Sequence, residues 1–350
     1  VMHQLMINIG YRVQSTIHKV AKKLTFGSRM FTKNPPSTVG KGNVASQVIH
    51  FINRPMPKNV PTKTSRAMLG IEDDKIVPII RNHNKVTDES DAVFYFPGCG
   101  SERLFSQVGL ATQAMLYEVG AITVLPPGYL CCGYPQTSSG DIEKGHEISS
   151  DNRVQFHRIA NTLNYLDIKT VIVSCGTCMD QLTKYQFETI FPGCRLLDIH
   201  EYLMEKQVKM NDVSGVQYMY HEPCHNPMKT YASANVTKSL LNKDVKKNDR
   251  CCGESGTFAV TRPDIATQVK MRKSEEITKD KKSLIKDNKD DVKILTSCPS
   301  CLQGLSRYGD ETGTDADYIV VEIAKNNLGA NWLQDYVEKA NNGGIEKVLL

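Results

Sequence analysis

The sequence contains two stretches in which adjacent cysteines are followed by glycine, "LCCGYP" at residues 130–135 and "RCCGESGTF" at residues 250–258. Two further stretches, "SCGTC" and "SCPSC", carry the Cys-x-x-Cys spacing. The chain has 11 cysteines, and ten of them fall into two sets of five. The first cysteine set is Cys99, Cys131, Cys132, Cys175 and Cys178, and the second cysteine set is Cys224, Cys251, Cys252, Cys298 and Cys301. Thiolates clustered in this way are typical ligands of soft metals.

Three other uses of such cysteines are disulfide formation, structural zinc binding and thioredoxin-like redox chemistry. Disulfides suit small secreted domains, whereas this chain has 350 residues and no recognisable secretion signal. A structural zinc takes four ligands, and each set offers five, two of them adjacent. A thioredoxin-like role would explain the Cys-x-x-Cys pairs but leaves the adjacent cysteines unexplained. Adjacent thiolates point to opposite faces of an extended backbone and can reach different irons of one cluster. We therefore predict one iron–sulfur cluster in each half, held by its cysteine set.

The two sets belong to an internal duplication. Equivalent cysteines lie 125, 120 and 123 residues apart, counted from Cys99, Cys131 and Cys175. In each half an apolar run, "AVFYF" or "VQYMY", precedes the first cysteine, and a second run, "TVIV" or "VKIL", precedes the Cys-x-x-Cys pair. Helical stretches such as "GLATQAMLYEVG" lie between the cysteines. We expect an α/β fold of two pseudo-symmetric Rossmann-like halves, with parallel strands and the cysteines at their carboxyl ends.

The rest of the chain suggests three parts. Apolar residues spaced by three or four between Met2 and Val20 predict an amphipathic helix, and the prolines and glycines of residues 32–61 predict an extended connector. We therefore assign residues 1–90 to a helical and extended basic arm, 91–212 to a first cysteine-rich domain and 213–350 to a second. Of the net charge of +5, the arm contributes +9 and the remainder −4. Such an arm could dock on an acidic partner or an anionic membrane surface, or be a solvated segment.

Composition sets the broad class. With 40% hydrophobic and 23% charged residues the chain is typical of globular proteins. No apolar run approaches the roughly 18 to 20 residues that span a bilayer, which favours a cytoplasmic protein. Because lysine-rich runs such as "KDKKSLIKDNKDDVK" also carry acidic residues, we expect no nucleic-acid partner. The periodic pattern that starts at the first residues suggests a piece of a longer protein.

The two cysteine sets resemble the two cysteine-rich CCG domains shared by the B subunit of heterodisulfide reductase and the iron–sulfur component of glycolate and lactate oxidation systems. The phrases "CCGESGTFAVTRPDIATQVKMRK" and "WLQDYVEKANNGGIEKVLL" resemble the C-terminal part of FAD-linked D-lactate or glycolate dehydrogenases. The resemblance extends from about Asp91 to Leu350. It implies a [4Fe-4S] cluster of non-cubane type on each set, with the paired cysteines bridging irons. The spacing departs from the family, since only 26 residues separate Cys224 from Cys251, but no ligand is lost.

The resemblance implies an oxidoreductase: the electron-transfer module of a respiratory FAD-dependent 2-hydroxyacid dehydrogenase acting on D-lactate or glycolate. FAD would lie on an upstream domain or a partner subunit, with a ferredoxin-like iron–sulfur domain as a further partner. Electrons would pass to the membrane quinone pool or another acceptor, and the protein would be cytoplasmic or peripheral on the inner face of the cytoplasmic membrane. The alternatives are a heterodisulfide reductase-type subunit that cleaves a substrate disulfide at paired clusters, and a purely structural metal-binding scaffold. We assign no catalytic residue.

Several residues near the cysteines have two interpretations. His221 and His225 could each donate to a cluster sulfur or move a proton, and both also suit a structural role in the turn. Glu222 and Glu254 could tune the potential of a cluster, or face solvent. Cys194 belongs to neither set and is expected to be a buried thiol.

Overall fold

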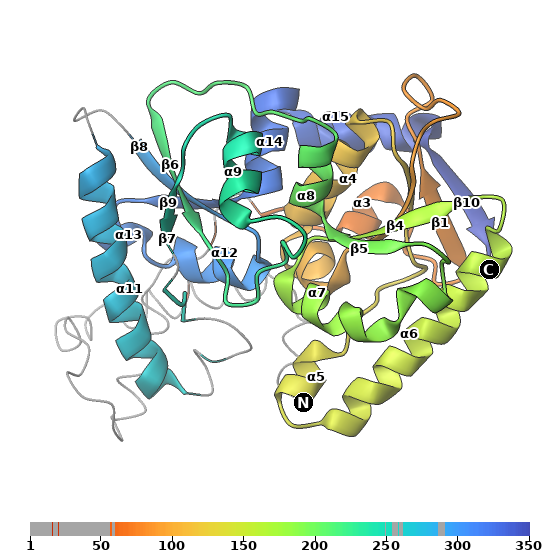
Figure 1. Cartoon of the computed structure of the whole chain (residues 1–350), viewed down its shortest axis with the longest axis horizontal. Helices are drawn as coiled ribbons and strands as arrows, with labels where there is room; N and C mark the ends of the chain where they lie inside the picture. The colour runs from red at the N-terminus through yellow and green to blue at the C-terminus, as the bar shows by residue number, and fades with distance from the viewer. Residues whose placement is uncertain are drawn as a thin grey trace. The chain divides into compact units, whose positions relative to one another are not determined.

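The computed structural model describes residues 60–248, 250–253, 262–285 and 291–350, together with Thr16, Val20, Pro57 and Phe258. Thr16 and Val20 are helical, and the rest of the amphipathic helix expected before residue 21 lies outside the described residues, as does most of the expected connector. The chain forms two compact units (Figure 1). The larger unit comprises Lys63–Asp212, His225–Asp244 and Ile319–Leu350, and the smaller unit comprises Val213–Cys224 and Val245–Tyr318.

The larger unit is built on a six-stranded sheet with the order β10-β1-β3-β2-β4-β5. Its strands are β1 (Ile76–Ile80), β2 (Ala92–Phe96), β3 (Ile122–Val124), β4 (Ile168–Val173), β5 (Arg195–Asp198) and β10 (Ile345–Leu349). The strands β3, β2, β4 and β5 are parallel, whereas β1 runs antiparallel to both β3 and β10. The parallel part of the sheet carries the first cysteine set.

Burial explains why these short runs form strands. Every residue of β2 is buried, as expected for a parallel strand covered on both faces. Phe94 of β2 packs edge-on against Phe156 with ring centroids 4.9 Å apart, and Phe156 stacks on Phe187 at 5.9 Å. These rings form the centre of a core that also contains Cys132, Cys175 and Cys178. The first cysteine set therefore borders the hydrophobic core of its unit.

Helices connect and cover the strands of the larger unit. They are α3 (Ser65–Leu69), α4 (Ser106–Glu118), α5 (Tyr134–Ser138), α6 (Ile142–Thr162), α7 (Gly176–Leu182), α8 (Ile199–Glu205), α9 (Ser233–Leu241), α14 (Ile319–Leu328) and α15 (Trp332–Lys339), with short helical turns at Gly100–Leu104, Thr183–Tyr185, Phe187–Thr189 and Ala340–Gly344. The helix α4 packs against α8, α14 and α15. Within the described part of the chain, no helix is long and apolar enough to cross a membrane.

The smaller unit contains a four-stranded, all-parallel sheet with the order β7-β6-β8-β9. Its elements are β6 (Val216–His221), β7 (Lys246–Asn248), β8 (Asp291–Thr296), β9 (Asp315–Tyr318), α11 (Pro263–Leu284), α12 (Pro299–Ser306) and α13 (Gly309–Thr312). The core packs Met219 and Ile294 of the sheet against Ile277 of α11 and Leu305 of α12. The long helix α11 and the shorter α12 are both visible beside this sheet in Figure 1.

The two sheets share one strand arrangement. The order β3-β2-β4-β5 in the larger unit corresponds to β7-β6-β8-β9 in the smaller one, and each fourth strand leads directly into a helix, α8 or α14. The predicted α/β fold with duplicated parallel sheets is therefore confirmed. The antiparallel strands β1 and β10 are an addition to the larger sheet that the sequence did not reveal.

The units do not follow the order of the chain. The segment Ile319–Leu350 belongs to the larger unit, because β10 pairs with β1 over five residues and α14 packs on α4. Trp332 and Tyr336 of α15 are also buried in this unit. The division into domains at residues 91–212 and 213–350 stays a prediction about the duplicated sequence, whereas the packing of the chain joins its last 32 residues to the first half.

Candidate metal centres

The first cysteine set lies at one edge of the larger sheet. Cys99 follows β2, the pair Cys131 and Cys132 follows β3, and Cys175 follows β4 and precedes α7, which contains Cys178. Because β3, β2 and β4 are adjacent and parallel, their carboxyl ends meet at the same edge of the sheet. The five thiols are thereby brought together from three loops.

Within this set the thiols contact one another in a fixed order. Cys99 interacts with Cys131, Cys131 with Cys132, Cys132 with Cys178, and Cys178 with Cys175. Cys132, Cys175 and Cys178 are buried, whereas Cys99 and Cys131 are partly exposed. The set therefore has three members in the protein interior and two toward solvent.

The second cysteine set occupies the corresponding edge of the smaller sheet. Cys224 follows β6, Cys251 and Cys252 follow β7, and Cys298 follows β8 and precedes α12, which contains Cys301. The strands β7, β6 and β8 are again adjacent and parallel. The duplication thus places each cysteine of the second set at the same topological position as its counterpart.

The order of contacts is also repeated. Cys224 interacts with Cys251, Cys251 with Cys252, Cys252 with Cys301, and Cys301 with Cys298. The Sγ atoms of Cys252 and Cys301 are 3.4 Å apart. Two sulfurs bound to one tetrahedral ion at about 2.3 Å lie about 3.8 Å apart, so this spacing is close to that of two ligands of one metal.

The crowding of thiols changes their acidity. Hydrogen bonding to a neighbouring thiol, followed by burial, raises the pKa of Cys99, Cys178 and Cys301. Hydrogen bonds from Cys224 and then Cys252 hold the pKa of Cys251 well below its usual range. Five thiolates cannot share so small and dry a space without a compensating positive charge. The donor set therefore fits a bound metal centre, which would supply that charge.

The Cys-x-x-Cys spacing has a structural reason. Cys175 and Cys298 have extended backbones and occupy the N-cap positions of α7 and α12, and Pro299 provides a favourable first helical residue for α12. Cys178 and Cys301 are then the third residues of their helices. The N-cap side chain and the third residue face the same end of a helix, as in a capping box. Both thiols of each pair therefore point toward the edge of the sheet.

The glycine after each cysteine pair is required by the backbone. Gly133 has φ of 86° and Gly253 has φ of 76°, values in the left-handed region that glycine adopts without strain. The turn at Gly253 brings its N–H to 3.4 Å from the Sγ of Cys251. A backbone N–H so placed stabilises a thiolate and can tune a bound cluster.

Gly98, beside Cys99, keeps the first set open. A Cβ atom at this position would come within 2.7 Å of the Sγ of Cys178, and its φ of 64° also favours glycine. Any other residue would fill the space beside that sulfur. In the second half the corresponding residue is Pro223, which comes two residues after His221.

Tyrosine hydroxyls hold the cysteine pairs in both halves. Tyr185 donates to the carbonyl oxygen of Cys132 at 3.0 Å, and Tyr308 donates to that of Cys252 at 3.0 Å. In the larger unit Asn152 adds a hydrogen bond from its Nδ2 atom to the carbonyl oxygen of Cys131 at 2.8 Å. These contacts fix the backbone from which the paired thiols project.

A second pair of tyrosines supports the serines that precede the Cys-x-x-Cys pairs. The hydroxyls of Tyr95 and Ser174 are 2.7 Å apart, and those of Tyr220 and Ser297 are 3.1 Å apart. Sequence reasoning missed all four tyrosines. They recur at separations of 125 residues (Tyr95 and Tyr220) and 123 residues (Tyr185 and Tyr308), so the repeat that revealed the cysteines also contained this signal.

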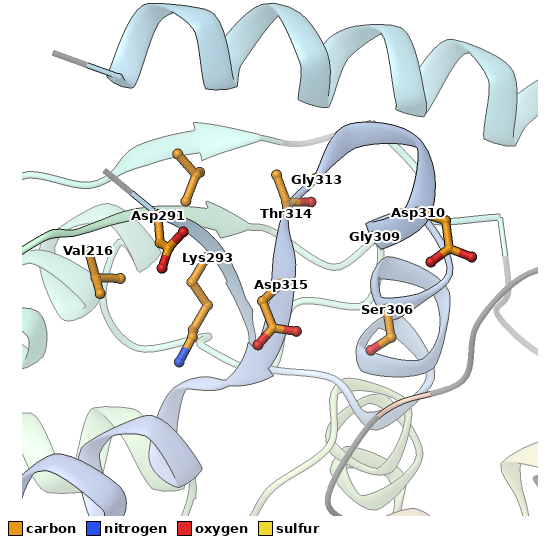
Figure 2. Close-up of a pocket in the computed structure, with 10 residues that line it drawn as sticks. Val216, Asp291, Lys293, Ser306, Gly309, Asp310, Gly313, Thr314 and Asp315 are labelled. Carbon is orange, nitrogen blue, oxygen red and sulfur yellow. The ribbon is translucent and has the colours of Figure 1, made fainter. Parts of the chain in front are cut away.

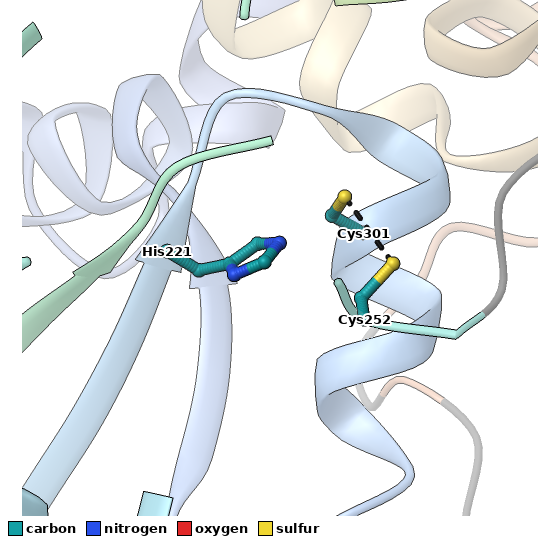
Figure 3. Close-up of side chains that lie close together, drawn as sticks. All are labelled: His221, Cys252 and Cys301. Atoms are coloured by element: carbon teal, nitrogen blue, oxygen red, sulfur yellow. Dashed lines mark hydrogen bonds between the residues drawn. The ribbon is translucent and has the colours of Figure 1, made fainter. Parts of the chain in front are cut away.

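His221, the last residue of β6, is fully buried in the smaller unit. One of its ring nitrogens and the Sγ atoms of Cys252 and Cys301 all lie within 4.8 Å of one another (Figure 3). Burial, and then the nearby ammonium of Lys273, lowers the pKa of His221 to about 3. The ring is therefore neutral, the form in which imidazole binds metals. His221 thus lies at the end of β6 beside the second cysteine set, and the roles that the sequence suggested for it stay predictions.

His225 lies in a different environment, in the larger unit. Its Nδ1 atom pairs with the carboxylate of Asp180, and its Nε2 atom is 3.0 Å from the hydroxyl of Tyr134. Lys229 also pairs with Asp180, at 3.0 Å. His225 and Asp180 are about one third exposed, so this hydrogen-bonded row reaches solvent. The arrangement orients the imidazole and could conduct a proton between water and the edge of the first set.

The remaining candidates differ from one another. Glu222 forms an ion pair with Lys247 and is partly buried, whereas Glu254 lies outside the described residues. Cys194 is partly exposed rather than buried, and it packs against the core of the larger unit. Burial raises the pKa of Cys194 to about 11. Cys194 is therefore a poorly reactive thiol, and it is not one of the thiols described above that contact one another within either set.

A cavity of about 490 Å³ lies at the opposite edge of the smaller sheet (Figure 2). Val216, Asp291 and Asp315, the first residues of β6, β8 and β9, line it together with Lys293. The amino ends of these strands face away from the edge that carries the second cysteine set. This cavity therefore does not form part of the candidate metal centres.

The cysteine positions coincide with segments that match a known protein family. A family model described as "Cysteine-rich domain" (CCG) matches residues 93–183 and 218–306. A second model, described as a domain of unknown function (DUF3400), matches residues 306–350. The two matched stretches correspond to the two halves of the duplication and include all ten cysteines of the two sets. That these cysteines bind metal stays a prediction.

Several curated proteins are similar to this chain. The B subunit of fumarate reductase (CoM/CoB) from Methanothermobacter marburgensis is 28% identical over 59% of this chain and 40% of its own length. The probable glycolate oxidase iron-sulfur subunit of Bacillus subtilis is 26% identical over 66% of this chain and 53% of its own length. Lactate utilization protein A of Macrococcus caseolyticus is 24% identical over 68% of this chain and 98% of its own length. The chain spans about half the length of the first curated relatives it matches.

Proposed function

Because the chain belongs to the family of proteins with cysteine-rich CCG domains, we propose that it is an iron–sulfur electron-transfer module with one cluster on each cysteine set. One observation carries this proposal. In both units five thiols from three adjacent strand ends contact one another in the same order, from the single cysteine through the adjacent pair to the Cys-x-x-Cys pair. A structural scaffold would need neither five ligands nor the same order twice.

The chemistry of the donors supports iron and sulfide over a single ion. Each set is composed of soft thiolates and exceeds the four ligands of a structural zinc. A bound cluster would supply one-electron transfer, and the protein would contribute burial, N–H groups and the fixed cysteine backbone that tune its potential. The form we propose is the [4Fe-4S] cluster, in either the cubane or the non-cubane arrangement.

The relatives suggest the reaction in which this module takes part. We propose that it serves a 2-hydroxyacid dehydrogenase, in line with the glycolate oxidase and lactate utilization names of its relatives. A flavin-binding domain or subunit would oxidise D-lactate or glycolate, and a ferredoxin-like iron–sulfur domain would be a further partner. The clusters would then pass single electrons to a quinone at the cytoplasmic membrane or to another acceptor. Such a module transfers electrons and does not bind the hydroxyacid itself.

Metal content tests the first part of the proposal. The chain, purified without oxygen or reconstituted with iron and sulfide, should hold about four irons and about four sulfides per cysteine set. Variants that replace all five cysteines of one set by serine should lose half of both. One zinc per set without sulfide would refute the proposal, because it would identify structural metal sites.

A second candidate function is the reduction of a substrate disulfide. It is favoured by the exposure of Cys224, which leaves the second set accessible from solvent. Two electrons from the reduced chain and two protons would convert a disulfide into two thiols. The loaded chain should be reduced with dithionite, freed of excess reductant and mixed with low-molecular-weight disulfides. Thiol release above that of a cysteine-depleted control would favour the reductase, whereas reoxidation by quinone analogues or a flavin partner alone would favour the relay.

A further inference from the structure

The two cysteine sets differ at one position beside the sulfurs. The strands β2 and β6 are equivalent, and each ends three residues before the first cysteine of its set. β2 ends with Phe96 and β6 ends with His221, and both side chains are fully buried. The duplication therefore provides an apolar ring in the first half and an imidazole in the second.

His221 has the surroundings of a ligand and not those of a core residue. Both ring nitrogens are buried and make no hydrogen bond of normal geometry to the described residues, although the backbone of Asn248 lies close enough to favour the protonated ring. Such a group costs free energy of roughly 1–3 kcal/mol in the folded protein unless another partner satisfies it. A fully buried imidazole without a well-formed hydrogen bond, aimed at two thiols, has the placement of a metal ligand.

The spacing leaves room for a metal. The ring nitrogen lies within 4.8 Å of the Sγ atoms of both Cys252 and Cys301, yet it hydrogen-bonds to neither. A tetrahedral ion bound to nitrogen at about 2.1 Å and to sulfur at about 2.3 Å separates those atoms by about 3.6 Å. Figure 3 shows the imidazole directed from the end of β6 toward the two sulfurs. Small side-chain adjustments would place all three atoms on one metal.

A second difference between the halves lies on the helix beside each set. Asn152 and Lys273 are each the eleventh residue of their helix, α6 or α11, and both are buried. Asn152 is neutral, whereas Lys273 brings a fully buried ammonium near Cys252 and Cys301. The second site thus carries basic groups at two positions where the first site carries none. The ammonium of Lys273, which also pairs with Glu276 at 3.2 Å, would make a cluster in the second half easier to reduce.

We propose that His221 ligates an iron of the second centre through a ring nitrogen, together with Cys252 and Cys301, so that this centre has mixed nitrogen and sulfur ligands while the first has sulfur alone. The inference rests on the proposed function, because it requires an iron–sulfur cluster on the second set. It predicts two electronically different centres in one duplicated protein. His221 is a ligand additional to the five thiolates, so the higher potential expected of the second centre follows from the buried ammonium of Lys273.

The experiment uses the full chain, reconstituted with iron and sulfide, in a Cys132→Ser background that removes the first centre. Pulsed electron paramagnetic resonance of the paramagnetic state should detect a nitrogen coupling of the strength of directly bound imidazole. Labelling histidine with ¹⁵N should change that coupling, which needs no further substitution and therefore no variant that could misfold. His221→Phe, which installs the residue of the first half, should abolish the coupling and change the midpoint potential of the second centre.

The reciprocal variant is the matched control. Phe96→His, made in a Cys252→Ser background, places an imidazole at the same position of the first set and should introduce a nitrogen coupling at the first centre. Iron and sulfide bound without a histidine coupling would overturn the assignment of His221 and leave the proposed function standing. A coupling that survives in His221→Phe would also overturn it. Absence of iron and sulfide would overturn both.

Discussion

The hydroxyl of Tyr185 is predicted to hold the first cysteine pair in place. It donates to the carbonyl oxygen of Cys132 at 3.0 Å and accepts from the Nδ2 atom of Asn152 at 2.9 Å. Tyr185→Phe removes this oxygen alone. The aromatic ring remains stacked on Phe187, whose centroid is 5.9 Å away, so no large cavity is created. The substitution therefore isolates the two hydrogen bonds.

Their contribution can be worked out from burial. Tyr185 is 1% exposed, and water cannot replace the lost partner of the Cys132 carbonyl. A buried hydrogen bond contributes about 0.5–1.5 kcal/mol to stability, so two such bonds contribute about 1–3 kcal/mol. We expect Tyr185→Phe to lower the free energy of unfolding of the larger unit by about 2 kcal/mol.

Urea unfolding of the metal-free chain, followed by tryptophan fluorescence, measures this difference. Trp332 is the single tryptophan of the sequence and is buried in the larger unit, so its signal reports on that unit. Tyr165→Phe is the matched control, because Tyr165 is 61% exposed. The control should stay within about 0.5 kcal/mol of the unsubstituted chain. If the two variants unfold at the same urea concentration, the hydroxyl of Tyr185 does not support the cysteine pair.

Three further predictions concern single groups. Cys252→Ser should remove the second centre and leave the first, and loss of both resonance signals in a folded chain would contradict separate ligand sets. Burial raises the pKa of Glu102 from 4.5 to about 7, although Arg66 pairs with its carboxylate. Because the folded state binds this proton more tightly than the unfolded state, the free energy of unfolding should fall as the pH rises from 4.5 to about 7. Glu102→Gln should remove this pH dependence in urea unfolding experiments. Arg66→Met leaves the Glu102 carboxylate buried without its cation and should cost about 3–5 kcal/mol at pH 8, and a loss below about 1 kcal/mol would show that the pair is not important for stability.

The parallel sheets could be predicted because their signal is local. Runs such as "AVFYF" are short and apolar, which indicates a buried strand. The glycine or proline beside the cysteine that follows indicates the turn at which the strand ends. The duplication then fixed which strands correspond. The cysteine positions at the strand ends follow from the same reasoning.

The edge of the larger sheet could not be predicted in this way. β1 and β10 pair across 265 residues, with Ile80 opposite Ile345, and no local pattern links them. The sequence "IEKVL" of β10 contains two charged residues, as suits a strand with partly exposed side chains, and gives a weak strand signal. Pairing between strands so far apart in the chain depends on tertiary packing, which a short stretch of sequence does not reveal.

The proposed role of His221 could not be predicted from the sequence for a different reason. A histidine at the end of an apolar run next to a cysteine suits a turn as well as a metal site, and the residue type alone does not decide between them. Alignment of the two halves places Phe96 opposite it, which shows that the duplicated strand does not require a polar residue there. The burial of the ring and its position beside Cys252 and Cys301 support the proposal and could be seen only in the structure.

The pairing of β10 with β1 has a consequence for the synthesis of the protein. Strands β2, β3 and β4, and with them every cysteine of the first set, have been synthesised once residue 178 is added, whereas β10 is completed only at Leu349. During the translation of the intervening residues β1 presents an unpaired edge, which nascent chains can use to associate with one another. Ribosome stalling in this interval should therefore favour aggregation, and a chaperone that shields Ile76–Ile80 should suppress it.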